Sequence, residues 1–261
     1  MKSKTLKFAI SIALLVEMTT PFWLTAQQPK YKLVDIPTLG GDKAYGQGNG
    51  PGTSQFLNNA GTVVGSSDTT TPDLTCGNPD CLVSHAFRWQ DGVLNDLGTL
   101  QGIGSHLFTA ANAINARGWI AGSSQNGEID PVTGSPAGHA VLWENAEILD
   151  LGTLGTGVES GGTYIVNGGA VVGFSSIDTS FDPFAHYGPY MSPTHAFIWK
   201  NGIMTDLGTL GGPDSFVAGL CDERRTELVP GASFTNSTQN PLPGSQRYTR
   251  SYGKTVSLLT S

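Results

Sequence analysis

Hydrophobic and polar residues alternate along this chain in short runs, and one such run returns three times. The strings HAFRWQDGVLNDLGTL, HAVLWENAEILDLGTL and HAFIWKNGIMTDLGTL begin at His85, His139 and His195, spaced 54 and 56 residues apart. Apolar residues at every second position are typical of β-strands, and no long helical periodicity follows the N-terminus. The pattern predicts an all-β chain built from repeated units.

A second string precedes each of these copies. It reads LNNAGTVVGSS from Leu57, INARGWIAGSS from Ile114 and VNGGAVVGFSS from Val166. A partial copy, VDIPTLGG, starts at Val34 and matches the DLGTLGG that closes the third long string. The repeated region therefore starts before the first complete copy.

Each unit is predicted to contain four antiparallel strands. The segment before the Asn-containing turn pairs with VVGSS, and HAFRW pairs with VLNDLGTL across Asp91-Gly92. The corresponding dipeptides are Asn145-Ala146 and Asn201-Gly202, and Asp-Gly and Asn-Gly fit a two-residue hairpin turn. In this register one face carries His85, Phe87, Trp89, Leu94 and Asp96, and the other carries Ala86, Val93 and Leu97.

Apolar residues on both faces indicate a sheet held between neighbouring sheets. Four antiparallel strands every fifty-odd residues describe a propeller blade, so we expect an all-β, propeller-like array. Three full units and partial ones fall short of the four to eight blades that close a ring. We therefore expect an open or incomplete array whose exposed sheet edges allow self-association.

On these strings the chain resembles the HAF-repeat family of probable extracellular proteins, over roughly Val34 to Gly212. The resemblance implies an exported bacterial protein, and the family brings no established activity or catalytic residue. The second copy departs from the pattern, with Val141 in place of Phe and Ala146 in place of Gly.

The recurring positions are interpreted as structural. We expect each His to bond a backbone carbonyl or a side chain of a neighbouring strand, and each Asp to cap a turn or bond a strand end. An alternative is that one His per unit converges on a metal ion. The structural positions are His85, Phe87, Trp89, Asp96, Gly98, His139, Trp143, Asp150, Gly152, His195, Phe197, Trp199, Asp206 and Gly208.

Composition narrows the range of partners. The 35 Gly and 15 Pro among 261 residues suit a chain that reverses direction often. A net charge of -7 argues against nucleic acid and against anionic membrane surfaces as partners.

The N-terminus predicts export. Lys2, Lys4 and Lys7 precede a short apolar run, and LTA ending at Ala26 resembles a signal-peptidase site. We expect residues 1–26 to be a signal peptide, and a retained membrane anchor is the alternative. The product is then secreted or extracellular, or periplasmic, with no membrane association after cleavage.

In an oxidising compartment, Cys76 and Cys81 around CGNPDC are expected to form a disulfide-closed loop. Two thiols without further ligands at suitable spacing do not make a zinc site, and Cys221 is left over.

No nucleophile elbow, zinc-protease motif or phosphate loop is present in the sequence, and no cofactor is expected. We expect function, if any, in the loops between GSS and the His: Asp68 to Ser84, Gln125 to Gly138, and Ile177 to Thr194. Exposed aromatic side chains in the third loop could bind carbohydrate or another extracellular protein, although the alternative of a loop that packs on itself is favoured. These candidates are Phe181, Phe184, His186, Tyr187 and Tyr190.

The repeated region is assigned to residues 27–215, and the pattern degenerates over residues 216–261. A one-base shift of a back-translation of QRYTRSYGKTV permits VHPFLWENG, so we interpret Gln246 to Ser261 as a frameshifted tail. The sequence favours an exported, non-catalytic binding or surface-interaction module. The alternatives are a secreted polysaccharide hydrolase with acids in the loops, and a truncated fragment without a function of its own.

Overall fold

The computed structural model describes residues 32–46, 55–74, 78, 80–101, 107–182, 192–209 and 211–217, together with the backbone of 228–234 and 255–257. The chain divides into two compact units, Met1–Asp35 and Ile36–Ser261, and every described strand belongs to the second. The described residues contain no helix, and so none that is long and apolar enough to cross a membrane. The expected all-β class is confirmed.

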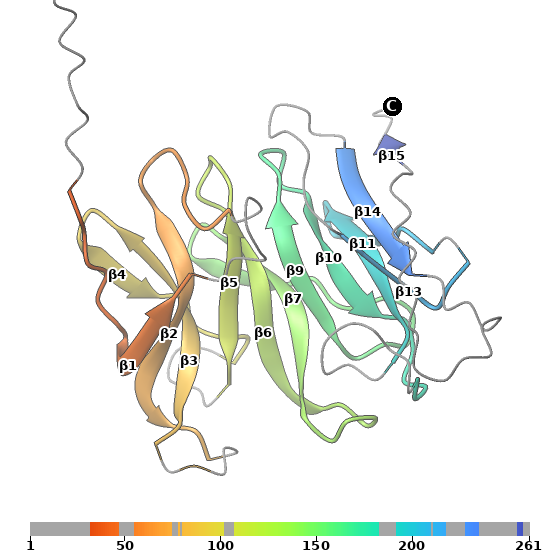
Figure 1. Ribbon diagram of the computed structural model, residues 1–261, viewed down its shortest axis with the longest axis horizontal. Coiled ribbons are helices and arrows are strands. Elements are labelled where there is room, and N and C mark those ends of the chain that lie inside the picture. Colours follow the sequence, from red (N-terminus) through yellow and green to blue (C-terminus); the bar gives the residue numbers. More distant parts are fainter. Residues whose placement is uncertain are drawn as a thin grey trace, which may run out of the picture. The chain divides into compact units, whose positions relative to one another are not determined.

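Three four-stranded antiparallel sheets follow one another along the second unit (Figure 1). In each sheet the strands lie side by side in chain order, so every connection within a sheet is a hairpin-like link between neighbours. Sheet 1 contains β1 (Gly40–Tyr45), β2 (Val63–Pro72), β3 (Leu82–Gln90) and β4 (Val93–Asp96). Sheet 2 contains β5 (Thr109–Ile114), β6 (Ile120–Ile129), β7 (Pro136–Glu144) and β8 (Glu147–Asp150). Sheet 3 contains β9 (Ser160–Ile165), β10 (Val171–Ser176), β11 (Thr194–Lys200) and β12 (Ile203–Asp206).

Sheet 4 has three described strands, β13 (Asp214–Val217), β14 (Leu228–Phe234) and β15 (Thr255–Ser257). Ser215 pairs with Ser233, as Ser160 pairs with Ser175 in sheet 3. Backbone pairing therefore continues into the region where the sequence pattern degenerates. Most of the proposed frameshifted tail, Gln246 to Ser261, lies outside the described residues.

The predicted register of the HAF hairpin is the one observed. Phe87 pairs with Asp96 and Trp89 pairs with Leu94, with the corresponding pairs in sheets 2 and 3. Two details of the prediction are wrong. The last strand ends at Asp96, because the following Leu97-Gly98-Thr99 turns away from the sheet. Val93 is 58% exposed, because it lies beside the turn on the outermost strand.

The two-residue turns of these hairpins share one conformation in all three sheets. Asp91 and Gly92 have φ of 51° and 87°, and Asn201 and Gly202 have 51° and 84°. Positive φ at both positions is typical of a type I′ turn, whose twist matches that of the strands. Ala146 adopts the same turn with φ of 66°, so the second hairpin keeps its geometry at the cost of a strained alanine.

The expected loops after GSS are partly strand. Pro72 pairs with Leu82 and Ile129 pairs with Pro136, each beyond a register shift in the ladder. The predicted first hairpin also differs in sheet 1. There β1 supplies the first strand, and residues around Leu57 add only isolated pairing to β2.

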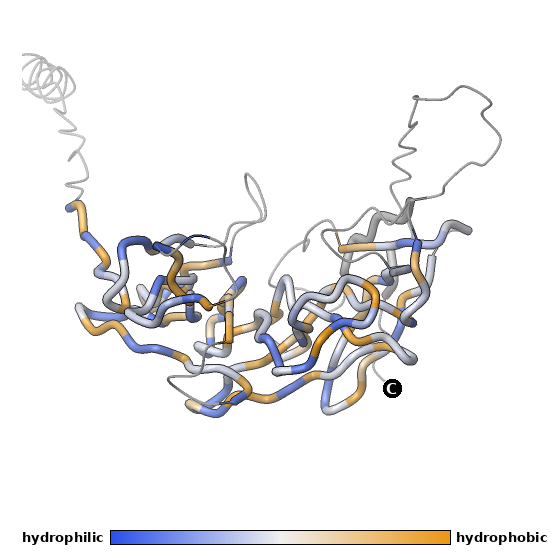
Figure 2. Tube along the Cα trace, turned by 90° about the horizontal axis from the view of Figure 1, so that it is seen from below, coloured by the Kyte–Doolittle hydropathy of each residue, from blue (hydrophilic) through white to orange (hydrophobic). Residues whose placement is uncertain are grey.

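Successive sheets pack face to face. Val64 and Ala86 of sheet 1 contact Ile114, Ile120 and Trp143 of sheet 2 in one buried cluster. Two further clusters lie between sheets 2 and 3 and between sheet 3 and Val217 of sheet 4. Figure 2 shows hydrophobic and hydrophilic residues interspersed along the strands rather than gathered in one segment. Both faces of sheets 2 and 3 are thus buried, as the sequence predicted.

The glycine of VVG marks the closest packing inside each sheet. A Cβ on Gly122 would collide with the carbonyl oxygen of Ala110 and lie 2.9 Å from the Trp143 ring. On Gly65 and Gly173 it would collide with the corresponding carbonyls and lie 3.0 Å from Phe87 and Phe197. This position requires glycine because an aromatic ring of the third strand lies over the second.

Candidate functional site

The recurring histidine and aspartate form one hydrogen-bonded unit in each sheet. Nδ1 of His85 lies 2.8 Å from Oδ2 of Asp96, and the corresponding distances in the other sheets are both 2.9 Å. Oδ1 of each aspartate also accepts the N–H of the glycine two residues on, at 2.7 to 2.8 Å. These glycines, at positions 98, 152 and 208, have φ between 68° and 75°. One carboxylate therefore joins the third strand, the fourth strand and the turn that leaves the sheet.

The sheet 2 unit has perturbed ionisation. The hydrogen bond that His139 Nδ1–H donates to Asp150 raises the pKa of His139 against the opposing effect of burial, and the charges of Asp150, Glu128 and Glu159 raise it further. Burial pushes the pKa of Asp150 upward, but hydrogen bonds from His139 and Gly152 outweigh it and leave that pKa below its usual value. The pair is a charge-assisted bond at the strand ends.

The described residues do not gather the repeated histidines into a metal-binding group. Each histidine uses Nδ1 on the aspartate of its own sheet, and the described residues hold no group of three His, Cys, Asp or Glu side chains suited to a metal ion.

Side-chain hydroxyls connect each sheet to the next. The amides of Ala86, Ala140 and Ala196 donate to Thr109 Oγ1, Ser160 Oγ and Ser215 Oγ of the following sheet, at 2.7 to 3.0 Å. The amides of Leu39, Leu100 and Leu154 donate to the serine two residues after the glycine of each VVG-type segment, at 2.8 to 3.1 Å. The DLGTL and SS segments are thus the two halves of a contact between units.

An acidic position in these contacts was missed by sequence reasoning. Oε2 of Glu159 accepts the N–H of Gly138 at 2.9 Å, and Oδ1 of Asp214 accepts the N–H of Thr194 at 2.9 Å. Each acid immediately precedes the serine that holds the HAF alanine, and each donor immediately precedes a repeated histidine. The sequence signal for this position is an acidic residue directly before the serine. It does not recur in sheet 2, because Phe108 occupies the same place before Thr109.

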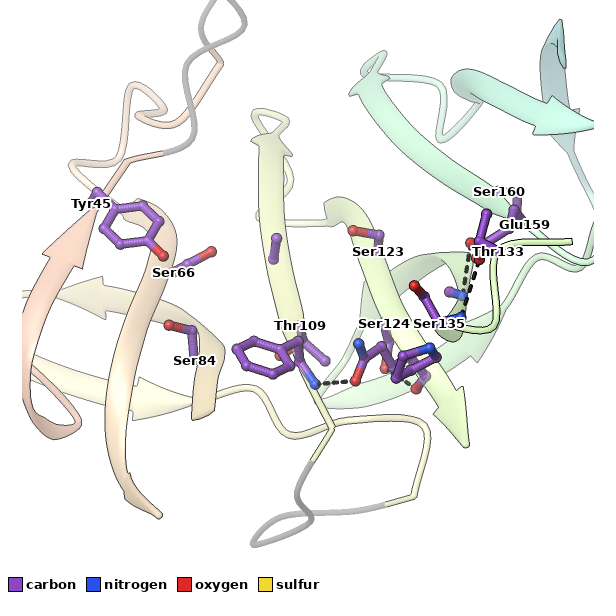
Figure 3. A pocket seen from close by; sticks show the side chains of 15 residues that line it. Tyr45, Ser66, Ser84, Thr109, Ser123, Ser124, Thr133, Ser135, Glu159 and Ser160 are labelled. Atoms are coloured by element: carbon purple, nitrogen blue, oxygen red, sulfur yellow. Dashed lines mark hydrogen bonds between the residues drawn. The ribbon is translucent and has the colours of Figure 1, made fainter. Parts of the chain in front are cut away.

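A pocket of about 380 Å³ is lined by residues of sheets 1 to 3 and of the segments between their strands. Tyr45, Ser66 and Ser84 of sheet 1 lie on one side, and Thr133, Glu159 and Ser160 lie on the other (Figure 3). Thr109 and Ser123 of sheet 2 lie between them. Hydroxyl-bearing residues dominate the lining: Tyr45, Ser66, Ser84, Thr109, Ser123, Ser124, Thr133, Ser135 and Ser160. The remaining lining includes the ring of Phe108, the amide of Gln125 and the carboxyl of Glu159. Thr109, Ser124 and Ser160 already hold the contacts between sheets, and Ser84 and Thr133 bond Asp68 and Asp130. The hydroxyls of Tyr45, Ser66, Ser123 and Ser135 lie beside the rings of Tyr45 and Phe108 in the rest of the lining.

Two groups of this pocket stand out energetically. Ser66 is 2% exposed, and its Oγ has no hydrogen-bond partner within the described part of the chain. Burial raises the pKa of Glu159 to about 7, with a smaller upward effect from the Asp130 charge and a downward effect from the Gly138 N–H. The pocket therefore contains an unsatisfied hydroxyl and an acid that is partly protonated near neutral pH.

The sequence-predicted binding residues are not brought to this pocket. Phe181 is 61% exposed and is not among its lining residues, and Phe184, His186, Tyr187 and Tyr190 lie outside the described residues. Cys81 is disulfide-bonded, while Cys76 lies outside the described residues. The predicted loops nevertheless contribute residues to the pocket, since Ser84, Thr133 and Ser135 line it.

Comparison with known proteins finds no matching protein-family profile, no matching curated protein and no matching solved structure.

Proposed function

We propose that this chain is an exported, propeller-like repeat protein of the HAF type that binds a neutral saccharide in the pocket lined by sheets 1 to 3. The observation that carries the binding proposal is the concentration of hydroxyl side chains around a cavity of about 380 Å³. That volume lies within the range of small-ligand sites.

The propeller assignment is supported by the strand order. Sheets 1 to 3 are four-stranded antiparallel meanders, and both faces of sheets 2 and 3 pack against the preceding and following sheets. A propeller blade has this construction. Export and a secreted or extracellular location are proposed from the N-terminal residues 1–26 alone.

The saccharide assignment is supported by the chemistry of the lining. Sugar hydroxyls both donate and accept, and serine and threonine hydroxyls can match them in either role. Tyr45 is 46% exposed and borders the pocket, so its ring is available for stacking on a sugar face. A ligand hydroxyl would satisfy Ser66 after a rotation about χ1, which needs no movement of the backbone.

Charge supports a neutral ligand over a phosphorylated or acidic one. The described lining residues contain one carboxyl, Glu159, and neither lysine nor arginine. An anionic sugar would therefore meet no compensating positive charge from these residues.

The test is calorimetric titration with a panel of neutral trisaccharides: maltotriose, cellotriose, chitotriose and xylotriose. We expect one of them to bind, and Ser66→Ala and Tyr45→Ala each to weaken its affinity roughly tenfold, as expected for loss of one buried hydrogen bond or one stacking contact. Thr205→Ala is the matched control, because Thr205 is an exposed residue of β12 away from the lining. Equal affinity of wild type and both pocket variants would refute the assignment.

A hydrolase is the second candidate, and the pKa of Glu159 near 7 is what favours it. A protonated carboxyl can act as general acid on a glycosidic oxygen. The equivalent position of Asp214 favours a structural role instead, since both acids accept a backbone N–H from the preceding sheet. Incubation of the bound saccharide with wild type and Glu159→Gln separates the two, because only an enzyme releases product that the variant does not.

A further inference from the structure

The contact between successive sheets is made at one row of residues on the first three strands. In sheet 2, Ile114 pairs with Ile120, which pairs with Trp143. In sheet 3 the corresponding row is Ile165, Val171 and Trp199. Each row belongs to a buried cluster with the preceding sheet. The six residues of the two rows are all between 0% and 8% exposed. We call the face that carries this row the rear face of a sheet, and the opposite face its forward face.

Sheet 1 carries the same row with the same residue types. Leu57 pairs with Val63, and Val63 pairs with Trp89. Leu57 is 56% exposed, whereas Ile114 and Ile165 are 2% and 1% exposed. Val63 and Trp89 are half-buried, although their counterparts in sheets 2 and 3 are buried. The difference arises because no described element packs over this row, although His85 and Phe87 on the same face are buried and Leu39 bonds the neighbouring Ser67.

We infer that the rear face of sheet 1 receives the forward face of a sheet from a second copy of this chain. The row Leu57, Val63 and Trp89 reproduces two sites that are already occupied by sheets of this same chain. A surface of this shape and residue type therefore fits another such sheet better than it fits an unrelated partner. Self-association then uses a sheet face, in contrast to the sheet edges expected from the sequence.

The position of the partner surface follows from the same contact. The forward faces of sheets 1 to 3 are covered by the next sheet, so the second copy presents the forward face of its sheet 4, β13 to β15. The interface is head-to-tail, and such interfaces close into rings or extend as filaments. Two copies with four described sheets each bring eight sheets together, which is within the range of closed propellers.

A backbone hydrogen bond on sheet 1 matches the bonds that connect successive sheets elsewhere in the chain. The amide of Leu39 donates to Ser67 Oγ at 2.8 Å, as Leu100 and Leu154 do to the serines of sheets 2 and 3. Sheet 1 thus already holds the segment that elsewhere connects it to a preceding sheet. What it lacks among the described residues is the preceding sheet itself.

Sedimentation equilibrium over a range of protein concentrations tests the inference. We expect the wild-type chain to associate, and Leu57→Lys to weaken association at least about tenfold by placing a charge in the apolar contact. Val93→Lys is the control, because Val93 is similarly exposed at 58% but lies at a hairpin turn outside the row. Circular dichroism confirms that both variants fold, which is expected because both positions are exposed.

Each outcome decides the matter. Association lost in Leu57→Lys and retained in Val93→Lys supports the inference. A wild-type monomer at every concentration overturns it and indicates that the chain covers this face itself. Association unaffected by Leu57→Lys also overturns it and places the contact elsewhere, for example at a sheet edge. Saccharide binding is measured separately, so its failure would leave this result unchanged.

Discussion

Asp96 joins three parts of sheet 1 through one carboxylate: Oδ2 accepts Nδ1 of His85 at 2.8 Å, and Oδ1 accepts the N–H of Gly98 at 2.8 Å. The same arrangement occurs in sheets 2 and 3 with different burial. The His85 side chain is 2% exposed, whereas that of His195 is 15% exposed. The Asp96 and Asp206 side chains are 23% and 43% exposed.

This difference predicts unequal costs for the same substitution. Asp96→Asn should lower the free energy of unfolding by about 1–3 kcal/mol, because it weakens a buried charge-assisted hydrogen bond. Asp206→Asn should cost less than about 1 kcal/mol, because water competes for the more exposed pair. Urea denaturation of both variants measures the two values. Equal losses would contradict the proposed dependence on burial.

Stability should fall as pH rises through the titration of Glu159. Its pKa is about 7 in the folded chain, against 4.5 as the ordinary value. Between these values the folded state binds more protons than the unfolded state, so the free energy of unfolding decreases with rising pH, by up to roughly 3 kcal/mol. Glu159→Gln keeps an oxygen for the Gly138 N–H and removes the titration. The difference in stability between variant and wild type should therefore grow from pH 4.5 to 8, and a constant difference would show that Glu159 does not titrate in this range.

The hairpin turns of sheets 1 and 2 offer a reciprocal pair of substitutions. Ala146→Gly should stabilise the chain by about 0.5–1 kcal/mol, because alanine at φ of 66° is strained. Gly92→Ala should destabilise it by about 1 kcal/mol through backbone strain alone, since nothing lies within 4 Å of the added Cβ. Thermal unfolding of the two variants should give shifts of opposite sign. Shifts of the same sign would exclude backbone strain as the cause.

Gly122→Ala should be among the most damaging single-methyl additions, with a loss of about 2 kcal/mol or more. The added Cβ would collide with the Ala110 carbonyl and press on the Trp143 ring, and close-packed interiors tolerate such overlap poorly. Gly138→Ala is the control within the same sheet, because its Cβ would meet only ordinary contacts at 3.6 and 3.7 Å. Chemical denaturation should separate the two variants clearly. A similar small effect for both would mean that β5 moves aside without cost.

The strands and their register could be predicted because they depend on local alternation and on turn dipeptides. Phe87 opposite Asp96 follows directly from Asp91-Gly92 as the turn. The exposure of Val93 could not be predicted in this way, because alternation does not distinguish an outermost strand from an inner one.

The pocket could not be predicted because its residues meet only when sheets pack together. Ser66, Ser123 and Glu159 come from three different sheets, and no spacing in the sequence shows that Ser66 is buried without a partner. Aromatic residues predicted a binding segment from Phe181 to Tyr190, whereas the pocket is lined mainly by hydroxyl-bearing residues. The recurring GSS strings were the available signal, and they were interpreted only as strands.

A crystal structure with the tightest-binding trisaccharide tests the central claim most directly. The account predicts the sugar in the pocket lined by sheets 1 to 3, with one hydroxyl within hydrogen-bond distance of Ser66 Oγ and one ring face against Tyr45. A sugar bound on the segment around Phe181, or anywhere else while the pocket remains without it, would contradict the account.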